Sequence, residues 1–563
     1  MMLQSGRADL ADGVAHLQTL LFQHSGEDEQ TLLQLVERLE DMIQTAQTDL
    51  SQAVAKYPLH GLLTSLRYIL EQDRDVVGHD HDLLVRFILC LQAIWDIVKP
   101  ILCNDAPEGH TPEEAEDGDT SSTKDTLSYC WRALKESSML LSTLLPSAGP
   151  EQAHPLIELC FTQLAELRHR GAFSTVAQTW IACCLASRKL SDADAQPLLQ
   201  NWYAVVIAIL HNKTTINTRR SAGLPSLICG ILIAASDGQP MQQAFADLEA
   251  IAKEPMASDT AQEGSLPQVH ALNCIKDVLR NSRLGEASEG YVPLAMTLAA
   301  DALRSPAWAI RNCGLMLFRA VIDRLLGTNR AHLEEDGQGP KRLSLDQHPQ
   351  LLELVLGLLD SEAPSSSDSK EALARSEGVF PALQLLQRLA VPEQQRPAAL
   401  RAIRLLMASP SWHVRDKAAR TYASLVAKTD VGEELRDLLQ TSTASQNALH
   451  GALLGAKYLL RRSSARLRHA KGSVETDTWC LRKEHRSHVV SHMDRLYHTN
   501  MCLATKAAYI DLLAIFVEDD ASSRPATIQQ VAGPCPDDLH FTLTELHKVT
   551  HSNGSAAMLR LAV

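Results

Sequence analysis

The sequence predicts an all-α protein, specifically an α-solenoid of HEAT- or armadillo-like helical hairpins. Hydrophobic residues make up 45% of the chain but aromatic residues only 4%. Leu and Ala recur throughout, and alternating Val, Ile and Thr are scarce, which favours helices over sheet. Amphipathic helical periodicity recurs from about residue 31 to residue 516. At 563 residues the chain exceeds the roughly 250–300 residues at which a single core stops growing, so a repeat array is expected.

A repeated motif supports the solenoid. The stretch at 305–312 matches the stretch at 409–416 as S-P-x-W-x-[IV]-R-[ND], and the distance between them is about two hairpin repeats of roughly 40–47 residues plus insertions. The pattern predicts that each Ser caps a helix, that Pro takes the first helical position and that Trp packs onto the preceding helix. We expect the arginines, Arg311 and Arg415, to pair with a neighbouring acidic group, as in HEAT arrays.

Polar stretches divide the chain. They hold too few apolar residues to order themselves and are predicted to be loops or insertions. We therefore expect this order of segments: helical repeats over residues 1–103, an acidic loop insertion over 104–126, a core region over 127–329, polar loops with a short helix over 330–372, and HEAT-like repeats over 373–563.

Composition also bounds the compartment and excludes several kinds of site. The twelve cysteines are scattered without a C-x-x-C pair, which indicates core residues in a reducing compartment and neither disulfides nor a zinc site. The stretch "HDHD" at 79–82 is better explained as a solvated turn than as a metal site. The first residues lack a signal-peptide profile, and the longest apolar run is shorter than the roughly 20 residues that span a bilayer. We expect a cytoplasmic protein without membrane insertion and without metal.

Enzyme signatures are absent. The sequence contains no G-x-x-x-x-G-K-[ST] loop, no H-E-x-x-H and no G-x-S-x-G. No glycine-rich turn follows a strand, so no place for a nucleotide or S-adenosylmethionine is evident. We predict that the chain is not an enzyme and binds no cofactor itself.

A basic stretch stands out in a chain whose net charge is −14. Residues 457–495 hold ten Lys or Arg against four Asp or Glu. One interpretation is a solvated helix end. The other is a surface that contacts phosphates of folded RNA, because clustered cations release counterions on binding and aromatic residues for base stacking are few here. The candidate contacts are Arg461, Arg462, Arg466, Arg468 and Lys471.

Two adjacent arginines precede another apolar run. If that run is a helix, Arg219 and Arg220 lie in its first turn, where the helix dipole disfavours cations. The internal repeat aligns Arg220 with Arg311 and leaves Arg219 without a structural role. Gly223 allows close backbone approach and Pro225 lacks an N–H, so this turn is predicted to present its N–H groups and arginines to an anion.

Three blocks resemble the THADA family: "TRRSAGLP" at 218–225, "QVHALNCIKDVLRNSRLGE" at 268–286 and "SPAWAIRNCGLMLFRAVIDRLLG" at 305–327, with a weaker fourth, "APEGH", at 106–110. The resemblance implies a helical-repeat scaffold that is the non-catalytic subunit of a tRNA 2'-O-ribose methyltransferase acting on nucleotide 32 of the anticodon loop. The implied partners are tRNA and an FtsJ-like enzyme, which would carry the S-adenosylmethionine. Family members are usually far longer, so a fragment or a shortened member is expected.

The resemblance also names candidate residues for binding RNA or the partner enzyme. They are Arg219, Arg220, Ser221, Ala222, Gly223, Leu224 and Pro225 of the R-R-S-A-G-[IL]-P motif, with Arg283 and Arg311 in the other two blocks. Two alternatives stay open: a general HEAT-repeat adaptor for proteins without a role in RNA metabolism, and an unrecognised enzyme that uses S-adenosylmethionine unaided.

Overall fold

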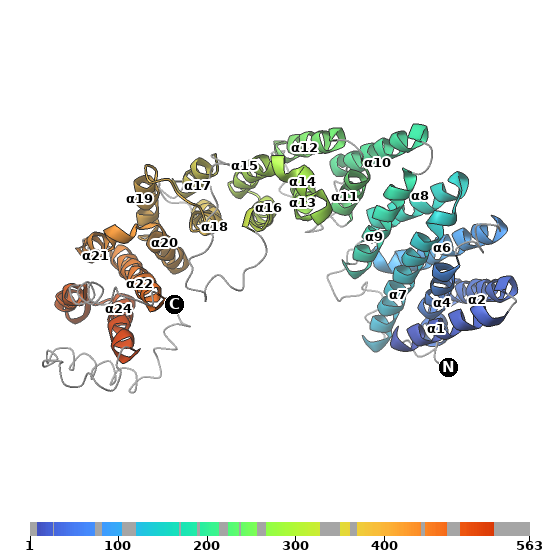
Figure 1. Cartoon of the computed structure of the whole chain (residues 1–563), viewed down its shortest axis with the longest axis horizontal. Coiled ribbons are helices and arrows are strands. Elements are labelled where there is room, and N and C mark those ends of the chain that lie inside the picture. Colours follow the sequence, from blue (N-terminus) through green and yellow to red (C-terminus); the bar gives the residue numbers. More distant parts are fainter. Residues whose placement is uncertain are drawn as a thin grey trace. The chain divides into compact units, whose positions relative to one another are not determined.

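The structure of the chain is a computed structural model (Figure 1). It describes residues 8–25, 28–73, 81–103, 120–167, 170–188, 192–212, 223–235, 238–255, 266–326, 350–360, 369–440, 445–469 and 485–522. The chain forms two compact units, Met1–Arg324 and Leu325–Val563.

The first unit is a stack of helical hairpins. Its helices are α1 (Ala8–Ser25), α2 (Asp28–Thr48), α3 (Leu50–Lys56), α4 (Leu59–Gln72), α6 (His81–Leu102), α7 (Thr120–Leu144), α8 (Pro150–Glu166), α9 (Arg170–Ser187), α10 (Asp192–Asn212), α11 (Leu224–Ala234), α12 (Gln239–Ala252), α13 (Pro267–Arg280), α14 (Gly285–Ser288), α15 (Val292–Leu303) and α16 (Trp308–Leu326). Successive pairs from α6 and α7 to α12 and α13 form hairpins. The second helix of each pair packs on the second helix of the next, through α4, α7, α9, α11 and α13.

The second unit repeats this arrangement. Its helices are α17 (Gln350–Asp360), α18 (Ser369–Leu386), α19 (Arg396–Leu406), α20 (Trp412–Leu425), α21 (Val431–Gln440), α22 (Gln446–His469) and α24 (Leu503–Ser522). The helices α18, α20, α22 and α24 pack on one another in order, with α17, α19 and α21 each paired to the helix that follows. This hairpin-on-hairpin order confirms the predicted all-α solenoid.

The predicted apolar faces are buried. In α15 one face carries five apolar residues at helical spacing, and all are at most 7% exposed: Val292, Ala295, Ala299, Ala302 and Leu303. The cysteines that lie in apolar runs are buried and unbonded, as predicted: Cys90, Cys160, Cys229 and Cys274. Burial of these small and aliphatic side chains supplies the hydrophobic free energy that holds the hairpins together.

The repeated motif begins its helices later than predicted. The helix α16 starts at Trp308, so Ser305 and Pro306 precede it, and α20 starts at Trp412. The Ser305 hydroxyl accepts a hydrogen bond from the backbone N–H of Ala307 at 3.3 Å, so this serine shapes a turn and does not cap the helix. The same holds for Ser409, whose hydroxyl accepts from the N–H two residues on.

The two tryptophans of this motif are exposed. Trp308 is 52% and Trp412 is 39% exposed, so the prediction that they pack onto the preceding helix is wrong. Each tryptophan is the first residue of its helix. Because side chains lean toward the helix N-terminus, an indole in the first turn points past the end of the helix and has no earlier turn to cover it.

One of the predicted loops contains helix: the stretch predicted as an insertion at 104–126 includes the start of α7 at Thr120. The polar region at 330–372, where a short helix is predicted, contains α17 and the first residues of α18. Residues 104–119, 327–349 and 361–368 lie outside the described residues. Within the described ranges, no helix combines the length and the apolar character that crossing a membrane requires.

Candidate functional site

The structure describes the R-R-S-A-G-L-P motif from Gly223 onward, and α11 begins at the next residue. Gly223 lies against the last turn of α8: a Cβ atom at this position would be 1.9 Å from the carbonyl oxygen of Leu164. Any side chain would therefore force the two helices apart. The predicted close backbone approach is confirmed, and the group approached is the backbone of α8.

Leu224 and Pro225 anchor the start of the helix. Both are buried, and the carbonyl of Gly223 accepts the N–H of Leu227 at 2.9 Å. Pro225 is the second helical residue, where its missing N–H breaks no helical hydrogen bond. An earlier start would place Pro225 in the helix interior, at a cost of about 3 kcal/mol. The prediction that the first turn holds Arg219 and Arg220 is therefore wrong.

The remaining motif residues are not described. Arg219, Arg220, Ser221 and Ala222 lie outside the described residues, and their proposed contacts stay predictions. What the structure fixes is the end of the motif, Gly223 to Pro225, which is packed into the core between α8 and α11.

A buried tryptophan locks the next turn of α11. Trp180 of α9 donates its indole N–H to the carbonyl of Leu227 at 3.0 Å. A Cβ atom at Gly230 would be 2.3 Å from the Trp180 ring, so the helix backbone rests directly on the indole. Trp180 also makes edge contacts with Phe161 and Trp202, at centroid distances of 5.5 and 5.4 Å. These contacts hold α11 against α9.

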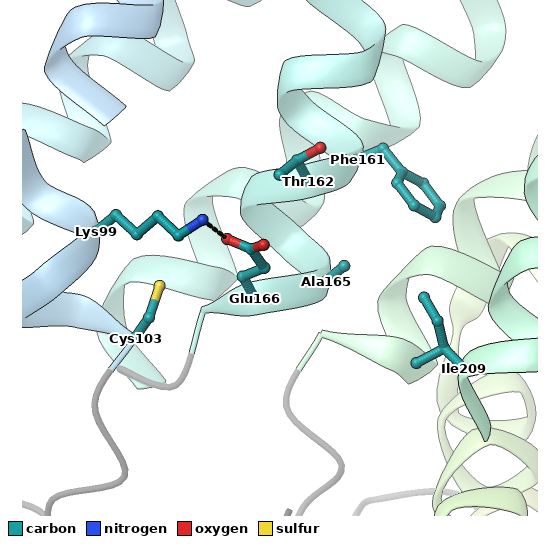
Figure 2. Close-up of a pocket in the computed structure, with 7 residues that line it drawn as sticks. All are labelled: Lys99, Cys103, Phe161, Thr162, Ala165, Glu166 and Ile209. Carbon is teal, nitrogen blue, oxygen red and sulfur yellow. Dashed lines mark ion pairs between the residues drawn. The ribbon is translucent and has the colours of Figure 1, made fainter. Parts of the chain in front are cut away.

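A groove of about 450 Å³ is lined in part by α8 (Figure 2). Its lining comes from three helices: Lys99 of α6 and Cys103 just after it, Phe161, Thr162, Ala165 and Glu166 of α8, and Ile209 of α10. The walls are largely apolar. They carry one ion pair, with Lys99 Nζ 2.7 Å from Glu166 Oε2, and this contact raises the pKa of Lys99.

The chemistry of the groove suits an apolar side chain more than a phosphate, because Glu166 neutralises the lysine that would attract an anion. The sequence does not indicate this groove, because its lining comes from three separate segments of the chain, none of which has a motif of its own. Among the described residues, no group of three or more His, Cys, Asp or Glu side chains could hold a metal ion.

Arg311 and Arg415 have the same structural role. Arg311 Nη1 donates to the carbonyls of Ser305 at 3.1 Å and Pro306 at 2.8 Å. Arg415 Nη1 donates to the carbonyls of Ser409 at 2.7 Å and Pro410 at 2.9 Å. Each arginine thus closes the turn that precedes its own helix.

The predicted acidic partner is wrong for Arg415. Its guanidinium also donates to Asn447 Oδ1 at 3.0 Å and His450 Nδ1 at 3.3 Å, and in the described part of the chain no carboxylate lies within 4.0 Å of it. Burial lowers the pKa of Arg415. The backbone carbonyls of the preceding turn accept the hydrogen bonds that a carboxylate was expected to accept. They are the nearest acceptors to a guanidinium in the first turn of the helix.

The other predicted cations are dispersed. Arg283 is exposed on a 3₁₀ turn, Ser282–Leu284, that packs beside α11. On α22, Arg461 is exposed, whereas Arg462 donates to the carbonyls of Ala423 and Val426 at the end of α20. The side chains of Arg466 and Arg468 are not described, and Lys471 lies outside the described residues.

Comparison with known proteins places these features in a family. A family model described as "THADA/TRM732, DUF2428" matches residues 82–309. A second, "Trm732, C-terminal TPR repeats", continues over residues 311–459. The chain belongs to the THADA/Trm732 family. The two matches extend from α6 to α22 and include the Gly223 contact, the groove and both copies of the tryptophan motif.

Curated THADA/Trm732 relatives are much longer than this chain. It is 32% identical over 381 residues to "tRNA (32-2'-O)-methyltransferase regulator trm732" of Schizosaccharomyces pombe, covering 63% of this chain and 25% of the relative. It is 24% identical over 597 residues to "tRNA (32-2'-O)-methyltransferase regulator THADA" of Mus musculus, covering 88% of this chain and 30% of the relative. The chain therefore spans about a quarter to a third of these relatives.

Two solved structures align with most of this chain at low identity. Importin beta aligns with a TM-score of 0.31 and 10% identity over 93% of this chain and 76% of that chain. The TSC2 N-terminus aligns with a TM-score of 0.27 and 12% identity over 85% of this chain and 98% of that chain.

Proposed function

We propose that this chain is a non-catalytic regulatory subunit for 2'-O-ribose methylation of nucleotide 32 in the anticodon loop of tRNA. In this role it binds an FtsJ-like methyltransferase and presents tRNA to it, and S-adenosylmethionine is bound by the partner enzyme. The observation that carries the proposal is the family match, which runs almost without interruption from residue 82 to residue 459 and whose relatives are named as regulators of this methylation.

The packing around α11 supports a role for the arginine motif. Gly223 and Pro225 are fixed in the core against α8, so the chain is anchored three residues after Arg220 in the sequence. Rigid placement of a binding group reduces the entropy lost when it engages a partner. Arg219 and Arg220 are proposed to contact the RNA backbone or the partner enzyme from this point.

A double substitution tests the motif. Arg219→Ala with Arg220→Ala is expected to abolish methylation of nucleotide 32 in cells while the protein level stays normal. Arg38→Ala with Arg319→Ala is the matched control, because it removes two exposed arginines of the same unit outside the motif. Normal methylation in the motif variant would refute the role of these arginines.

Affinity purification of the tagged chain separates this proposal from a general protein adaptor. The proposal expects an FtsJ-like methyltransferase and tRNA in the purified material, with the tRNA released as salt is raised. An adaptor without a role in RNA metabolism would bring down protein partners but no tRNA, and deletion of the chain would leave methylation unchanged. The purified chain alone is expected to transfer no methyl group from S-adenosylmethionine.

A further inference from the structure

Trp308 and Trp412 are exposed at equivalent places in the two units. Trp308 opens α16 and is 52% exposed, and Trp412 opens α20 and is 39% exposed. Exposure is not general for tryptophan in this chain: Trp95, Trp180 and Trp202 are at most 8% exposed. Single exposed apolar residues are common on protein surfaces, but the same residue exposed in the same setting twice needs a specific explanation.

The turns that present the two indoles are built alike. In each, the arginine three residues after the tryptophan donates to two successive carbonyls, over 2.8–3.1 Å for Arg311 and 2.7–2.9 Å for Arg415. In each, a serine hydroxyl accepts a backbone N–H at 3.3 Å. Two charge-assisted hydrogen bonds in a five-residue segment restrain the backbone just before the tryptophan.

The second turn is tied to the next hairpin as well. Arg415 is only 6% exposed and donates to Asn447 and His450 in the first two turns of α22. Trp412 therefore projects from a braced segment and not from a loose loop. A rigid aromatic side chain with two rotatable bonds loses little entropy on binding, as is typical of binding hot spots.

The first turns that carry the two indoles hold no acidic side chain to repel an anion, although an acid there would stabilise the helix. Arg304, four residues before Trp308, is exposed, and its Nη1 lies 3.7 Å from Asp301 Oδ1. In α20 the carboxylate of Asp416 is engaged by Arg420 and Tyr458, at 3.0 and 2.6 Å.

We propose that Trp308 and Trp412 are stacking platforms for unpaired bases of RNA. A nucleotide combines a flat aromatic face with a phosphate, which matches an exposed indole beside a helix N-terminus free of acidic residues. Stacking tolerates every base, so the two residues would add affinity without reading sequence. This inference rests on the proposed function and names residues by which the chain holds tRNA.

Paired substitutions test whether the aromatic face matters. In the purified complex with the methyltransferase, Trp308→Leu and Trp412→Leu are each expected to weaken tRNA binding roughly 10-fold, because the apolar bulk stays and the stacking face is lost. Trp308→Phe and Trp412→Phe should stay within about 3-fold of wild type, since a phenyl ring still stacks. Met501→Ala is the matched control: this apolar residue is 90% exposed and has no ring.

Fluorescence gives a second readout that a general loss of stability would not mimic. A stacked base quenches indole emission, so adding an anticodon stem-loop is expected to quench wild type more than Trp308→Phe or Trp412→Phe. Thermal unfolding of all four variants should match wild type, because the substituted side chains are exposed.

The outcomes separate the inference from the proposed function. If wild type binds tRNA and the two leucine variants bind it equally well, the stacking inference is wrong and the proposed function stands. If the leucine variants instead release the methyltransferase, these residues are a protein-docking site and the inference is overturned. If the wild-type complex binds no tRNA, the proposed function itself fails.

Discussion

Gly223 packs directly on the carbonyl of Leu164, and a Cβ atom would lie 1.9 Å from that oxygen. Because backbone cannot yield as a flexible side chain can, Gly223→Ala must displace α11 from α8. We expect this variant to lose at least about 2 kcal/mol of stability and to unfold several degrees below wild type in a thermal scan of the purified chain.

Gly238→Ala is the control for this prediction. Gly238 also precedes a helix, α12, but a Cβ atom there would have nothing within 4 Å, so the melting temperature is expected to stay within about a degree of wild type or to rise slightly. Equal melting temperatures for the two variants would contradict the contact between Gly223 and Leu164.

Arg415 closes its turn and links α20 to α22, so its loss should be costly. Arg415→Met keeps the length and apolar stem but leaves the carbonyls of Ser409 and Pro410 without their donor. We expect a loss of about 3 kcal/mol in the free energy of unfolding, measured by urea denaturation. Arg420→Met removes a half-exposed ion pair with Asp416 and should cost less than about 1 kcal/mol. Equal costs would show that Arg415 does not brace the turn.

The Arg415 contact also predicts a dependence on pH. His450 Nδ1 accepts the Nε–H of Arg415 at 3.3 Å, which requires a neutral imidazole. Burial and the nearby guanidinium lower the pKa of His450 from 6.5 to about 4. Because this pKa is below that of the unfolded chain, the histidine's contribution to stability is complete above about pH 6.5 and is lost as the pH falls toward 4.

A substitution isolates this contribution. His450→Gln offers Arg415 an uncharged oxygen acceptor that does not titrate in this range. Urea denaturation at pH 7 and at pH 4.5 is expected to show a smaller loss of stability for the variant than for wild type. Other titrating groups, including His60, whose pKa is also lowered to about 4, affect both proteins alike. An identical loss in both proteins would contradict the assigned role of His450.

The helices and their stacking were predictable because they follow from local patterns. Periodic apolar residues in α15 identify its buried face, and the internal repeat identifies the solenoid. The exposure of Trp308 was not predictable, because it depends on a two-residue shift in where the helix starts. That shift is set by a serine turn and by Arg311, which has two carbonyls within reach, and sequence patterns locate helix ends poorly.

The site was predictable only in part, for a different reason. The glycine of the arginine motif indicated a close backbone approach, but not that Leu164, some sixty positions earlier, is what it approaches. Likewise, a run of arginines indicates charge but not how each guanidinium is used. Long-range partners are set by how hairpins stack, and this information is not carried by the motif itself.

The adjacent residues Arg461 and Arg462 show that two arginines in one run can have different structural roles, and this difference can be measured. Arg462 donates to the carbonyls of Ala423 and Val426 at the end of α20, so Arg462→Ala should lower the melting temperature. Arg461 is exposed, so Arg461→Ala should leave the melting temperature unchanged.

If Arg461 contacts a phosphate, Arg461→Ala weakens tRNA binding and reduces the slope of log K against log salt by about one, whereas Arg461→Lys preserves the slope. An unchanged slope in Arg461→Ala would remove Arg461 from the predicted RNA surface, and an unchanged melting temperature in Arg462→Ala would refute its capping of α20.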